Sequence, residues 1–252
     1  MNDNKQTRTA LITGGGVGIG AAIARALADD GLKVAITYRT HAPTQEFLDG
    51  LREASGHEPL ALAVDATDEA AVNQMVETVA GKLGRIDVLV NNIGGLIKRA
   101  RLTELTLDLW QEVQACNVVS TFLVTRAVRP HMPEGGRIIN LSSLAAESGG
   151  HPGALAYATS KGAIVSFTRA LAQELSPEGI TVNAVLPGFI EATPFHDTFT
   201  TAESKAKTIT GIPVGRAGVP EDVASAVAWL ATPGAAFVSG AMIDVNGAQY
   251  FA

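Results

Sequence analysis

Tyr157 and Lys161 are the two side chains whose types and spacing most directly suggest chemistry. They stand four residues apart in a segment of helical periodicity, so both project from the same face of the expected helix. A tyrosine hydroxyl, with a pKa of about 10, is a weak base at neutral pH. A neighbouring ammonium group stabilises the phenolate and lowers that pKa, so the pair could exchange a proton with a bound molecule. Because such pairs are also common on helix surfaces, other features of the sequence must show whether this pair takes part in proton exchange.

A glycine-rich segment near the start of the chain has the composition of a phosphate-binding loop. It runs Thr13-Gly14-Gly15-Gly16-Val17-Gly18-Ile19-Gly20, between an apolar run and an alanine-rich helical stretch. Glycines permit a tight turn and close approach to a pyrophosphate, and a helix N-terminus offers unpaired N–H groups. We therefore expect a dinucleotide here; a tight structural turn is the alternative. The expected contacts are Gly14, Gly16, Val17, Gly18, Ile19 and Gly20.

The hydrophobic pattern supplies the elements that must position these residues. Apolar runs alternate with longer segments of helical period, which is typical of a parallel sheet covered on both faces. Residues 1–252 are therefore expected to form a single Rossmann-type, doubly wound α/β domain of about seven strands. Strands are expected at 10–13, 33–38, 60–64, 86–90, 137–141, 180–186 and 242–245, and helices at 18–30, 43–54, 68–83, 107–128, 155–175 and 221–231.

The composition is that of a globular protein and narrows the range of partners. Of the 252 residues, 46% are hydrophobic and 17% are charged, and the net charge is −6. An acidic chain without basic runs argues against nucleic-acid binding, which depends on neutralising phosphates. The single cysteine, Cys116, cannot form an internal disulfide, and residues 1–9 lack the apolar stretch of a signal peptide. Both features lead us to expect a cytoplasmic protein.

Neither a membrane segment nor a metal site is expected. The uncharged stretch Val223–Ile243 is long enough to cross a bilayer, but Pro233 and Gly234 would break a helix in its middle. The five histidines lack metal-binding spacing and have no acidic cluster beside them.

Taken in order, the motifs resemble those of the short-chain dehydrogenase/reductase family. The spacing Gly14-x-x-x-Gly18-x-Gly20 is followed by Asn91-Asn92-Ile93-Gly94, Asn117, Ser143, Tyr157-x-x-x-Lys161 and Pro187-Gly188. This resemblance covers nearly the whole chain and implies an oxidoreductase with a nicotinamide cofactor. It implies that Tyr157 donates or accepts the proton and that Lys161 binds the nicotinamide ribose. Lys161 and the positive nicotinamide ring of the oxidised cofactor would together lower the Tyr157 pKa. It also implies that Ser143 holds the substrate oxygen and that Asn117 anchors a water linking Lys161 to solvent.

Two adjacent serines compete for one place in this pattern. Ser142 and Ser143 follow an expected strand, where successive side chains point to opposite faces. The family pattern places the catalytic serine second, which selects Ser143 and leaves Ser142 as the alternative. The 14 residues from Ser143 to Tyr157 exceed the usual gap by one, and we expect the glycine-rich stretch 147–156 to absorb the extra residue.

The same resemblance implies further cofactor contacts. Asp65 matches the residue that binds the adenine amino group, and it could also cap the structure that follows it, since both roles can hold at a strand end. The family often has a threonine five residues after Pro187; that position is Ala192, so Thr193 becomes the candidate for the nicotinamide carboxamide. The remaining implied contacts are Ala66, Asn92, Gly94, Pro187, Gly188 and Ile190.

The end of the second expected strand decides between NAD and NADP. A carboxylate there would bind the ribose 2′-hydroxyl of NAD and repel a 2′-phosphate. The position holds Tyr38 followed by Arg39, whose planar guanidinium can pair with a phosphate. Val17 stands where many NADP-using relatives carry a second basic residue. We therefore expect NADP to be preferred and NAD to be a weaker alternative; an ordinary solvated Arg39 is the competing interpretation.

Residues 190–218 depart from the alternating pattern. They are polar and threonine-rich and include Phe195, His196 and Phe199. Because such sheets bind ligands outside the carboxyl ends of their strands, we expect a substrate lid here; a mobile surface segment is the alternative.

Three functions are compatible with these residues. The leading one is an NADP-dependent carbonyl reductase for a small ketone or secondary alcohol. A likeness to 3-oxoacyl-carrier-protein reductases suggests a 3-oxoacyl thioester instead, on a carrier protein or on CoA. Glu134 and Glu178 argue against carrier docking, because they stand where those reductases commonly have basic residues. A non-catalytic dinucleotide sensor is the third. Relatives pair their two long helices, here 107–128 and 155–175, across one two-fold axis and their last strands across another, so we also expect a homotetramer.

Overall fold

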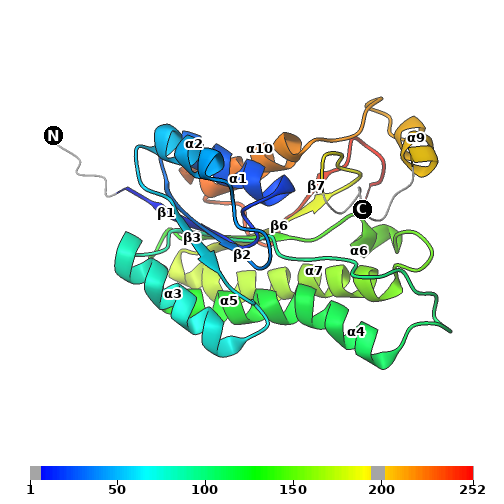
Figure 1. Cartoon of the computed structure of the whole chain (residues 1–252), viewed down its shortest axis with the longest axis horizontal. Coiled ribbons are helices and arrows are strands. Elements are labelled where there is room, and N and C mark those ends of the chain that lie inside the picture. Colours follow the sequence, from blue (N-terminus) through cyan, green and yellow to red (C-terminus); the bar gives the residue numbers. More distant parts are fainter. Residues whose placement is uncertain (1–6, 194–201, 252) are drawn as a thin grey trace.

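The strands expected from the apolar runs pair into a parallel sheet (Figure 1). The computed structural model describes residues 7–193 and 202–251. Within them the strand order is β3-β2-β1-β4-β5-β6-β7, and every neighbouring pair is parallel. The Rossmann-type sheet predicted from the sequence is thereby confirmed. The strands are β1 (Thr9–Ile12), β2 (Lys33–Tyr38), β3 (Leu60–Ala63), β4 (Val88–Asn91), β5 (Arg137–Leu141), β6 (Thr181–Pro187) and β7 (Met242–Val245).

Helices cover both faces of this sheet, as Figure 1 shows. One face carries α1 (Gly18–Asp29), α2 (Gln45–Ser55) and α10 (Pro220–Ala231), with α2 and α10 both packed on α1. The other face carries α3 (Glu69–Leu83), α4 (Leu107–Gln114), α5 (Ser120–Val128) and α7 (Leu155–Leu175). Two shorter helices, α6 (Ala145–Ser148) and α9 (Ala202–Thr210), lie at the end of the molecule toward which the strands point.

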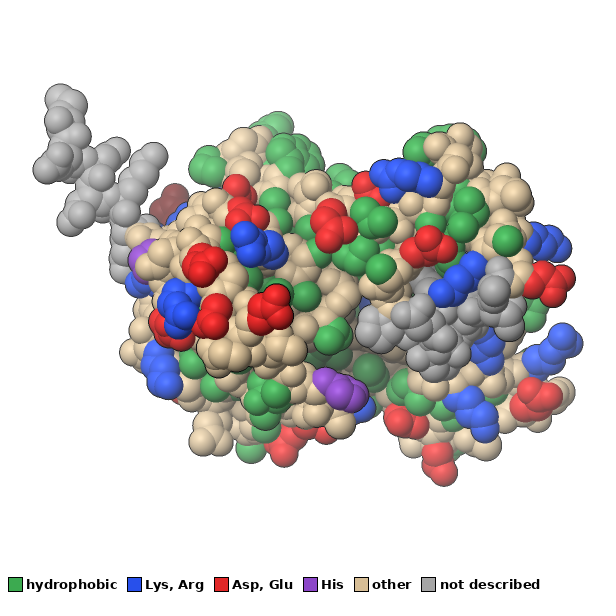
Figure 2. Space-filling view, turned by 45° about the horizontal axis from the view of Figure 1, so that its top comes forward, with side chains coloured by type: hydrophobic (Ala, Val, Ile, Leu, Met, Phe, Trp, Pro, Cys, Tyr) green, Lys and Arg blue, Asp and Glu red, His purple; other side chains and the backbone are tan. Residues whose placement is uncertain are grey.

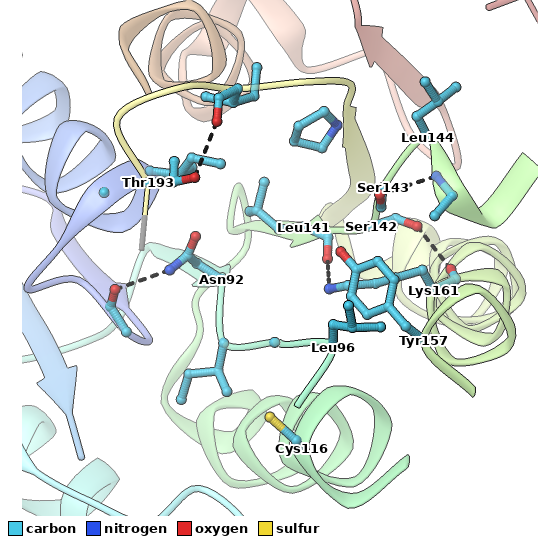
Figure 3. A pocket seen from close by; sticks show the side chains of 18 of the residues that line it. Asn92, Leu96, Cys116, Leu141, Ser142, Ser143, Leu144, Tyr157, Lys161 and Thr193 are labelled. Atoms are coloured by element: carbon cyan, nitrogen blue, oxygen red, sulfur yellow. Dashed lines mark hydrogen bonds between the residues drawn. The ribbon is translucent and has the colours of Figure 1, made fainter. Parts of the chain in front are cut away.

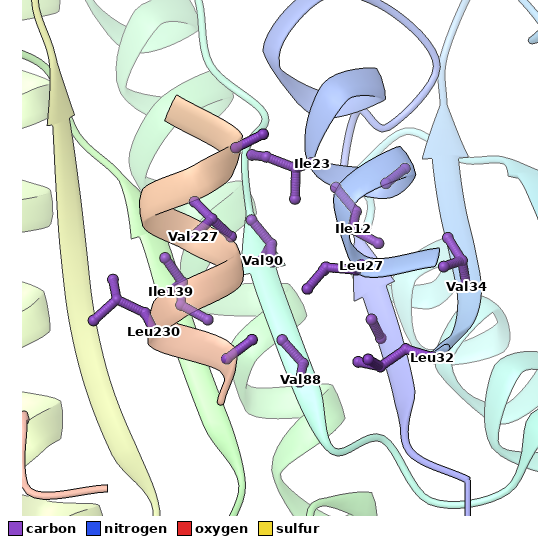
Figure 4. Packing of buried hydrophobic residues seen from close by; sticks show 14 of the residues in the cluster. Ile12, Ile23, Leu27, Leu32, Val34, Val88, Val90, Ile139, Val227 and Leu230 are labelled. Atoms are coloured by element: carbon purple, nitrogen blue, oxygen red, sulfur yellow. The ribbon is translucent and has the colours of Figure 1, made fainter. Parts of the chain in front are cut away.

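Each face of the sheet has its own apolar core. On the α1 side, Ile23 and Leu27 of α1 and Val227 and Leu230 of α10 pack over the buried side chains of the central strands (Figure 4). On the other side, the apolar faces of α3, α5 and α7 bury a second cluster. Each fully buried Leu or Ile stabilises the fold by about 1.5–3 kcal/mol. Together the two clusters therefore hold the sheet, and with it the ends of the strands, in place.

The predicted helix over 107–128 is not one regular α-helix. Between α4 and α5 the chain forms a π-helical turn, Ala115–Val119, with Asn117 in its middle. The side chain of Asn117 donates a hydrogen bond to the Val113 carbonyl at 2.8 Å, which takes over an acceptor in the helical ladder. Such one-turn bulges inside α-helices occur frequently at functional sites. Hydrophobic periodicity does not reveal the bulge, because the apolar stripe continues through it.

A buried polar chain links the sheet to the helices on the α5 and α7 face. Asn91 Nδ2 in β4 donates to Asn140 Oδ1 in β5 at 2.8 Å and to Thr125 Oγ1 in α5 at 2.9 Å. Asn140 Nδ2 in turn donates to Thr168 Oγ1 in α7 at 2.9 Å. Buried amides held in this way fix the position of α7 relative to β5, because an unpaired buried polar group is costly.

The uncharged stretch at 223–243 folds as two elements rather than one. Helix α10 ends at Ala231, a short 3-10 turn covers Pro233–Ala235, and β7 begins at Met242. Within the described residues, no helix is long and apolar enough to cross a membrane.

Candidate active site

The carboxyl ends of the strands open into a cavity of about 1020 Å³. Figure 3 shows that its wall brings together side chains from β5, α7 and the segments after β4 and β6. Two predicted site residues, Gly16 and Asn117, are not part of the wall. The predicted residues that line it are Gly14, Val17, Gly18, Ile19, Gly20, Tyr38, Arg39, Asp65, Ala66, Asn92, Gly94, Ser143, Tyr157, Lys161, Pro187, Gly188, Ile190 and Thr193.

The glycine loop leads into an α1 N-terminus that has no side-chain cap. Val17 is the N-cap residue and makes no capping hydrogen bond, so the first N–H groups of α1 are available to an anion. Gly20 is needed for close packing, because a Cβ there would lie 2.1 Å from the Gly14 carbonyl oxygen. Gly16 is different: a Cβ there would meet no atom nearer than 3.8 Å. Gly16 does not line the cavity, so the structure does not support its expected contact with a cofactor.

Asn92 holds the glycine loop in place, a role that the sequence did not suggest. Its Nδ2 donates to the backbone oxygens of Thr13 at 3.0 Å and Gly14 at 3.1 Å. Its own N–H donates to Thr13 Oγ1 at 3.0 Å. The end of β4 is therefore tied to the end of β1, where the loop begins.

Asp65 and Arg39 form an exposed part of the cavity wall. Asp65 Oδ1 accepts hydrogen bonds from Thr67 Oγ1 at 2.6 Å and Thr67 N at 2.9 Å. These bonds lower the pKa of Asp65, so its carboxylate is ionised. The capping interpretation of Asp65 therefore holds for the local turn, while the cap of α3 is Asp68. Arg39 is exposed beside half-buried Tyr38, and both stand at the end of β2.

Lys161 is buried and held from two sides. Its Nζ donates to the Leu141 carbonyl oxygen at 2.7 Å, and Ser142 Oγ donates to the Lys161 carbonyl oxygen at 2.8 Å (Figure 3). Burial lowers the pKa of Lys161 from 10.5 to about 8, because a buried ammonium loses its hydration. Gly94 lies against the same group: a Cβ there would come within 2.7 Å of Nζ.

In the protein without a cofactor, the pKa of Tyr157 lies above its ordinary value. Its hydroxyl is hydrogen-bonded to the Ser143 side chain, which lowers the pKa, but burial raises the pKa by more. The expectation that Lys161 and the positive nicotinamide ring together lower the Tyr157 pKa concerns the cofactor-bound protein and stays a prediction. The Lys161 Nζ stands 5.8 Å from the centre of the Tyr157 ring, and desolvation of the hydroxyl outweighs nearby favourable contacts.

The two serines at the end of β5 have different partners. Ser143 Oγ accepts a hydrogen bond from Ala145 N at 3.1 Å and is bonded to Tyr157, so it faces the cavity. The Ser142 hydroxyl donates its hydrogen bond to the Lys161 carbonyl oxygen. The geometry thus agrees with Ser143 as the substrate-facing serine. The expected glycine-rich stretch 147–156 runs from the end of α6 into α7, and its Gly149, Gly150 and Gly153 all have positive φ angles, of 78°, 70° and 83°.

Asn117 acts inside the protein rather than on the cavity surface. It is fully buried, and its side chain donates to Gly95 O at 2.9 Å and accepts from Gly95 N at 3.0 Å. A Cβ on Gly94 would lie 2.6 Å from Asn117 Oδ1. Asn117 therefore fixes the Gly94–Gly95 segment against Lys161, and the water-anchoring role stays a prediction.

The segment after β6 lies along the cavity as expected, with one strained residue. Ile190 forms an isolated parallel bridge with Gly218, and Thr193 Oγ1 donates to the Ile190 carbonyl at 3.1 Å. Ala192 has a φ of 54°, which is uncommon for a residue with a Cβ. The expected lid continues into Phe195, His196 and Phe199, which lie outside the described residues. Beyond them the sequence did not predict α9, whose Ser204 and Thr208 line the cavity.

Sequence reasoning did not assign several residues of the wall. Two of them are helical, one in the π-helical turn and one at the start of α5, and the others lie in loops and in the C-terminal segment. They include Leu96, Arg99, Cys116, Ser120, His151, Gln249 and Tyr250.

The sheet order and the cavity define a Rossmann-type α/β protein with a Ser–Tyr–Lys group at the carboxyl ends of its strands. A family model described as enoyl-(acyl carrier protein) reductase matches residues 15–248. A 3-oxoacyl-(acyl-carrier-protein) reductase of Synechocystis is 38% identical over 244 residues, covering 95% of this chain and 96% of that protein. The chain belongs to the short-chain dehydrogenase/reductase family and is an oxidoreductase of that family, as the motifs indicated.

Solved structures of the family superpose over nearly the whole chain. A dehydrogenase/reductase from Sinorhizobium meliloti 1021 is 37% identical, with a TM-score of 0.89, covering 97% of this chain and 95% of that one. A blue fluorescent protein from a metagenomic library, solved in complex with NADPH, is 38% identical, with a TM-score of 0.86, covering 99% of this chain and 100% of that one.

Proposed function

We propose that this protein is an NADPH-dependent reductase of 3-oxoacyl thioesters. The observation that carries the proposal is the group formed by Ser143, Tyr157 and buried Lys161, in one cavity with the glycine loop. The name of the Synechocystis relative supports the thioester as substrate class over the small free ketone that the sequence alone favoured.

The residues of the cavity fit a dinucleotide. The uncapped N-terminus of α1 offers N–H groups to a pyrophosphate, and exposed Arg39 offers a guanidinium to a 2′-phosphate. Tyr38 provides no carboxylate that would repel that phosphate. The NADPH complex of the metagenomic relative supports the same choice. Asp65, Ala66 and Asn92 would line the adenosine part, and Pro187, Gly188, Ile190 and Thr193 the nicotinamide part.

The proposed chemistry is the reduction of a carbonyl to a secondary alcohol. The cofactor, when bound, supplies a hydride to the carbonyl carbon. Ser143 donates a hydrogen bond to the carbonyl oxygen, and Tyr157 gives its hydroxyl proton to the same oxygen as negative charge develops there. Lys161, held by the Leu141 carbonyl, supplies positive charge beside the tyrosinate that remains. A Tyr157 pKa raised by burial suits a group that must hold its proton until this step.

The arrangement of the whole chain is part of the proposal. Residues 1–252 would act as one catalytic domain, with 190–218 as a lid over the substrate. Half-exposed apolar side chains on the helices of one face, Val119, Phe122 and Leu155, support pairing with a second copy there. A second two-fold contact, between the last strands of two copies, would complete the homotetramer. The cytoplasmic location stays a prediction from the composition.

A small free ketone is the second candidate substrate, because of the charges at the expected carrier-docking positions. Glu178 is ion-paired with Arg129, and Glu134 packs against Gly179 beside it. Figure 2 shows acidic and basic side chains interspersed over one face of the described residues, without a broad field of one sign. An acidic carrier protein would gain little steering from such a surface, whereas CoA thioesters and free ketones need none.

Consumption of NADPH by matched substrates tests the proposal. One 3-oxoacyl group is presented on an acyl carrier protein, on CoA and as a simple ethyl ester. We expect kcat/KM to be higher for the thioesters than for the ester. A higher value for the ester would favour the free ketone, and no turnover with any carbonyl substrate would favour a dinucleotide sensor.

A further inference from the structure

The segment that leads from β4 to α4 makes a strained turn at the cavity. Lys98 N donates to Leu96 O at 2.7 Å, which closes a three-residue turn around Ile97. Ile97 has a φ of 62°, a left-handed conformation that a β-branched residue rarely adopts. Leu96, where the turn begins, belongs to the cavity wall together with Tyr157 (Figure 3). Strain of this kind persists only where neighbouring contacts enforce it, and it concentrates at functional sites.

The contacts that hold this turn place Arg99 on the Tyr157 side of the cavity. Ala100 N donates to Gly153 O at 3.1 Å, and a Cβ on Gly153 would lie 3.2 Å from Arg99 Cβ. Helix α7 begins at Leu155, shortly after Gly153, and Tyr157 lies in its first turn. Arg99 is therefore tied to the segment that leads directly into the proposed proton donor.

The guanidinium of Arg99 has unused hydrogen-bond donors at the cavity. Arg99 is half-buried and lines the cavity. Its Nη1 donates to Pro152 O at 3.5 Å, a long hydrogen bond, and the guanidinium makes no other within residues 7–193 and 202–251. None of the ion pairs in the same part of the chain includes Arg99. Because a guanidinium offers several N–H donors in one plane, most of them are left for a bound molecule.

The cavity wall offers Arg99 no negative charge. Among the wall residues that the structure describes, the only carboxylate is that of Asp65. That carboxylate accepts hydrogen bonds from Thr67, and the positive charge that acts on it is that of Arg39. A cation in a cavity wall has lost part of its hydration, and an opposite charge interacts with it more strongly there than in open water. The Tyr157 side of the cavity is therefore suited to an anionic group.

We propose that Arg99 is a specificity-determining residue that pairs with an anionic group of the substrate, a carboxylate or a phosphate, remote from the carbonyl that is reduced. The planar fork of its guanidinium can bind two oxygens of either group. The inference rests on the proposed function, because the ligand is the carbonyl compound on which Ser143 and Tyr157 act. A carboxylate would stand at the far end of the acyl group, whereas a phosphate belongs to the arm of a thioester on CoA or on a carrier protein.

Three pairs of substrates, each with a charged and a neutral member, test this assignment and identify the source of the charge. The first pair is an N-acetylcysteamine thioester whose 3-oxoacyl chain ends in a carboxylate or in a carboxamide of equal size. The second is one 3-oxoacyl group on phosphopantetheine or on pantetheine. The third is a free oxo acid and its amide. We expect kcat/KM to be about five- to thirtyfold higher for the charged member of at least one pair, as for a half-buried ion pair.

Variants of the same segment show whether Arg99 makes the contact. Arg99→Met removes the charge and keeps an unbranched stem, so the ratio of kcat/KM between charged and neutral members should fall close to one. Arg99→Lys keeps the charge without the fork and should retain part of the ratio. Arg101→Met is the matched control, because Arg101 is exposed on the same segment and lies outside the cavity wall. An equal fall of the ratio in Arg101→Met and Arg99→Met would assign it to the general charge of the segment and overturn the direct contact.

The remaining outcomes separate this inference from the function on which it rests. Wild-type ratios near one for all three pairs overturn the role of Arg99 and leave the reductase intact, even if Arg99→Met does not fold. A raised KM for NADPH in Arg99→Met with unchanged ratios also overturns it, because Arg99 would then bind the cofactor. If only the free oxo acid is reduced, with a ratio that depends on Arg99, the thioester class fails and the inference stands. If no member of any pair is reduced, both fail.

Discussion

The cavity has two regions that differ in how their side chains are held. The inner region contains Tyr157 and Lys161 of α7. The outer region contains Val17, before α1, and Arg39, directly after β2. Lys161 is 3% exposed and bonded to the Leu141 carbonyl, whereas Val17 is 52% exposed and Arg39 is exposed as well.

This difference separates two kinds of effect. A change at a buried, bonded group alters the packing and the pKa values around it, so stability and chemistry change together. A change at an exposed group has few neighbours to disturb, so it alters ligand affinity with little effect on folding. Mutations in the inner region should therefore change both stability and the rate of the reaction. Mutations in the outer region should change ligand affinity alone.

The largest effect is expected for Tyr157→Phe in the inner region. The ring and its packing remain, but the proton for the carbonyl oxygen is lost. We expect kcat to fall by more than about a hundredfold, because acid–base groups contribute roughly 10²–10⁴-fold. NADPH binding, measured by the change in its fluorescence, should be nearly unchanged. A hundredth of the wild-type rate or more in Tyr157→Phe would contradict the assigned role.

The burial of Lys161 predicts a specific dependence of stability on pH. Its pKa in the folded protein is about 8, against an ordinary 10.5. Below about pH 8 both states carry the proton, and the folded state bears the full cost of the buried charge. Between about 8 and 10.5 the folded protein releases the proton first, so the free energy of unfolding should rise with pH. The raised pKa values of Cys116 and Tyr157 act oppositely, from about pH 9 and about pH 10 upward, so the effect of Lys161 is read as the difference between variants over the same window.

Lys161→Met should remove this rise. The shift corresponds to about 3 kcal/mol over the whole window, since one pKa unit is about 1.4 kcal/mol. Denaturant unfolding between pH 7.5 and 10 would measure it, with exposed Lys82→Met in α3 as the control. A rise that persists in Lys161→Met would assign the titration to another group.

The outlines of the fold could be predicted from the sequence, because apolar runs and helical periods depend on local sequence. β2, β5, β7 and α7 begin and end at the expected residues. The π-helical turn could not be predicted, because it depends on the bonds of Asn117 to Gly95, which is distant in sequence. Helix α9 was missed because its polar composition resembles that of a loop.

The candidate site, like the fold, has features that could be predicted from the sequence and features that could not. Most of the expected residues line the cavity because motif spacing follows the strand ends of a parallel sheet. The partner of Lys161 could not be found from the sequence, since it is the backbone carbonyl of Leu141, a group that every residue has. The direction of the Tyr157 pKa shift in the protein without a cofactor could not be predicted either, because burial is a property of the packed structure.

In the outer region, Arg39→Ala should alter cofactor preference alone. Loss of a charge-assisted contact with the 2′-phosphate should raise the KM for NADPH about ten- to a hundred-and-fifty-fold. The KM for NADH and the unfolding temperature should barely change, because Arg39 is exposed. Tyr38→Asp should shift preference further toward NADH by repelling the phosphate. Wild-type enzyme that uses NADH as efficiently as NADPH would show that Arg39 is an ordinary surface residue.

Gly94→Ala gives the smallest expected effect and tests the boundary between the two regions. Gly94 is itself exposed, yet a Cβ there would lie 2.6 Å from Asn117 Oδ1 and 2.7 Å from Lys161 Nζ. One methyl group must therefore displace side chains of the inner region. We expect a loss of about 1–3 kcal/mol in the free energy of unfolding, together with a fall in kcat as Lys161 moves from the Leu141 carbonyl.

Gly81→Ala in α3 is the matched control, because a Cβ there meets no atom within 4 Å. It should raise stability by about 0.5–1 kcal/mol, since alanine favours helix over glycine, and should leave kcat unchanged. If Gly94→Ala lowered stability without lowering kcat, the position of Lys161 would tolerate displacement. The inner region would then be rigid for reasons of folding alone, and the coupling of stability to chemistry drawn from the comparison would be wrong.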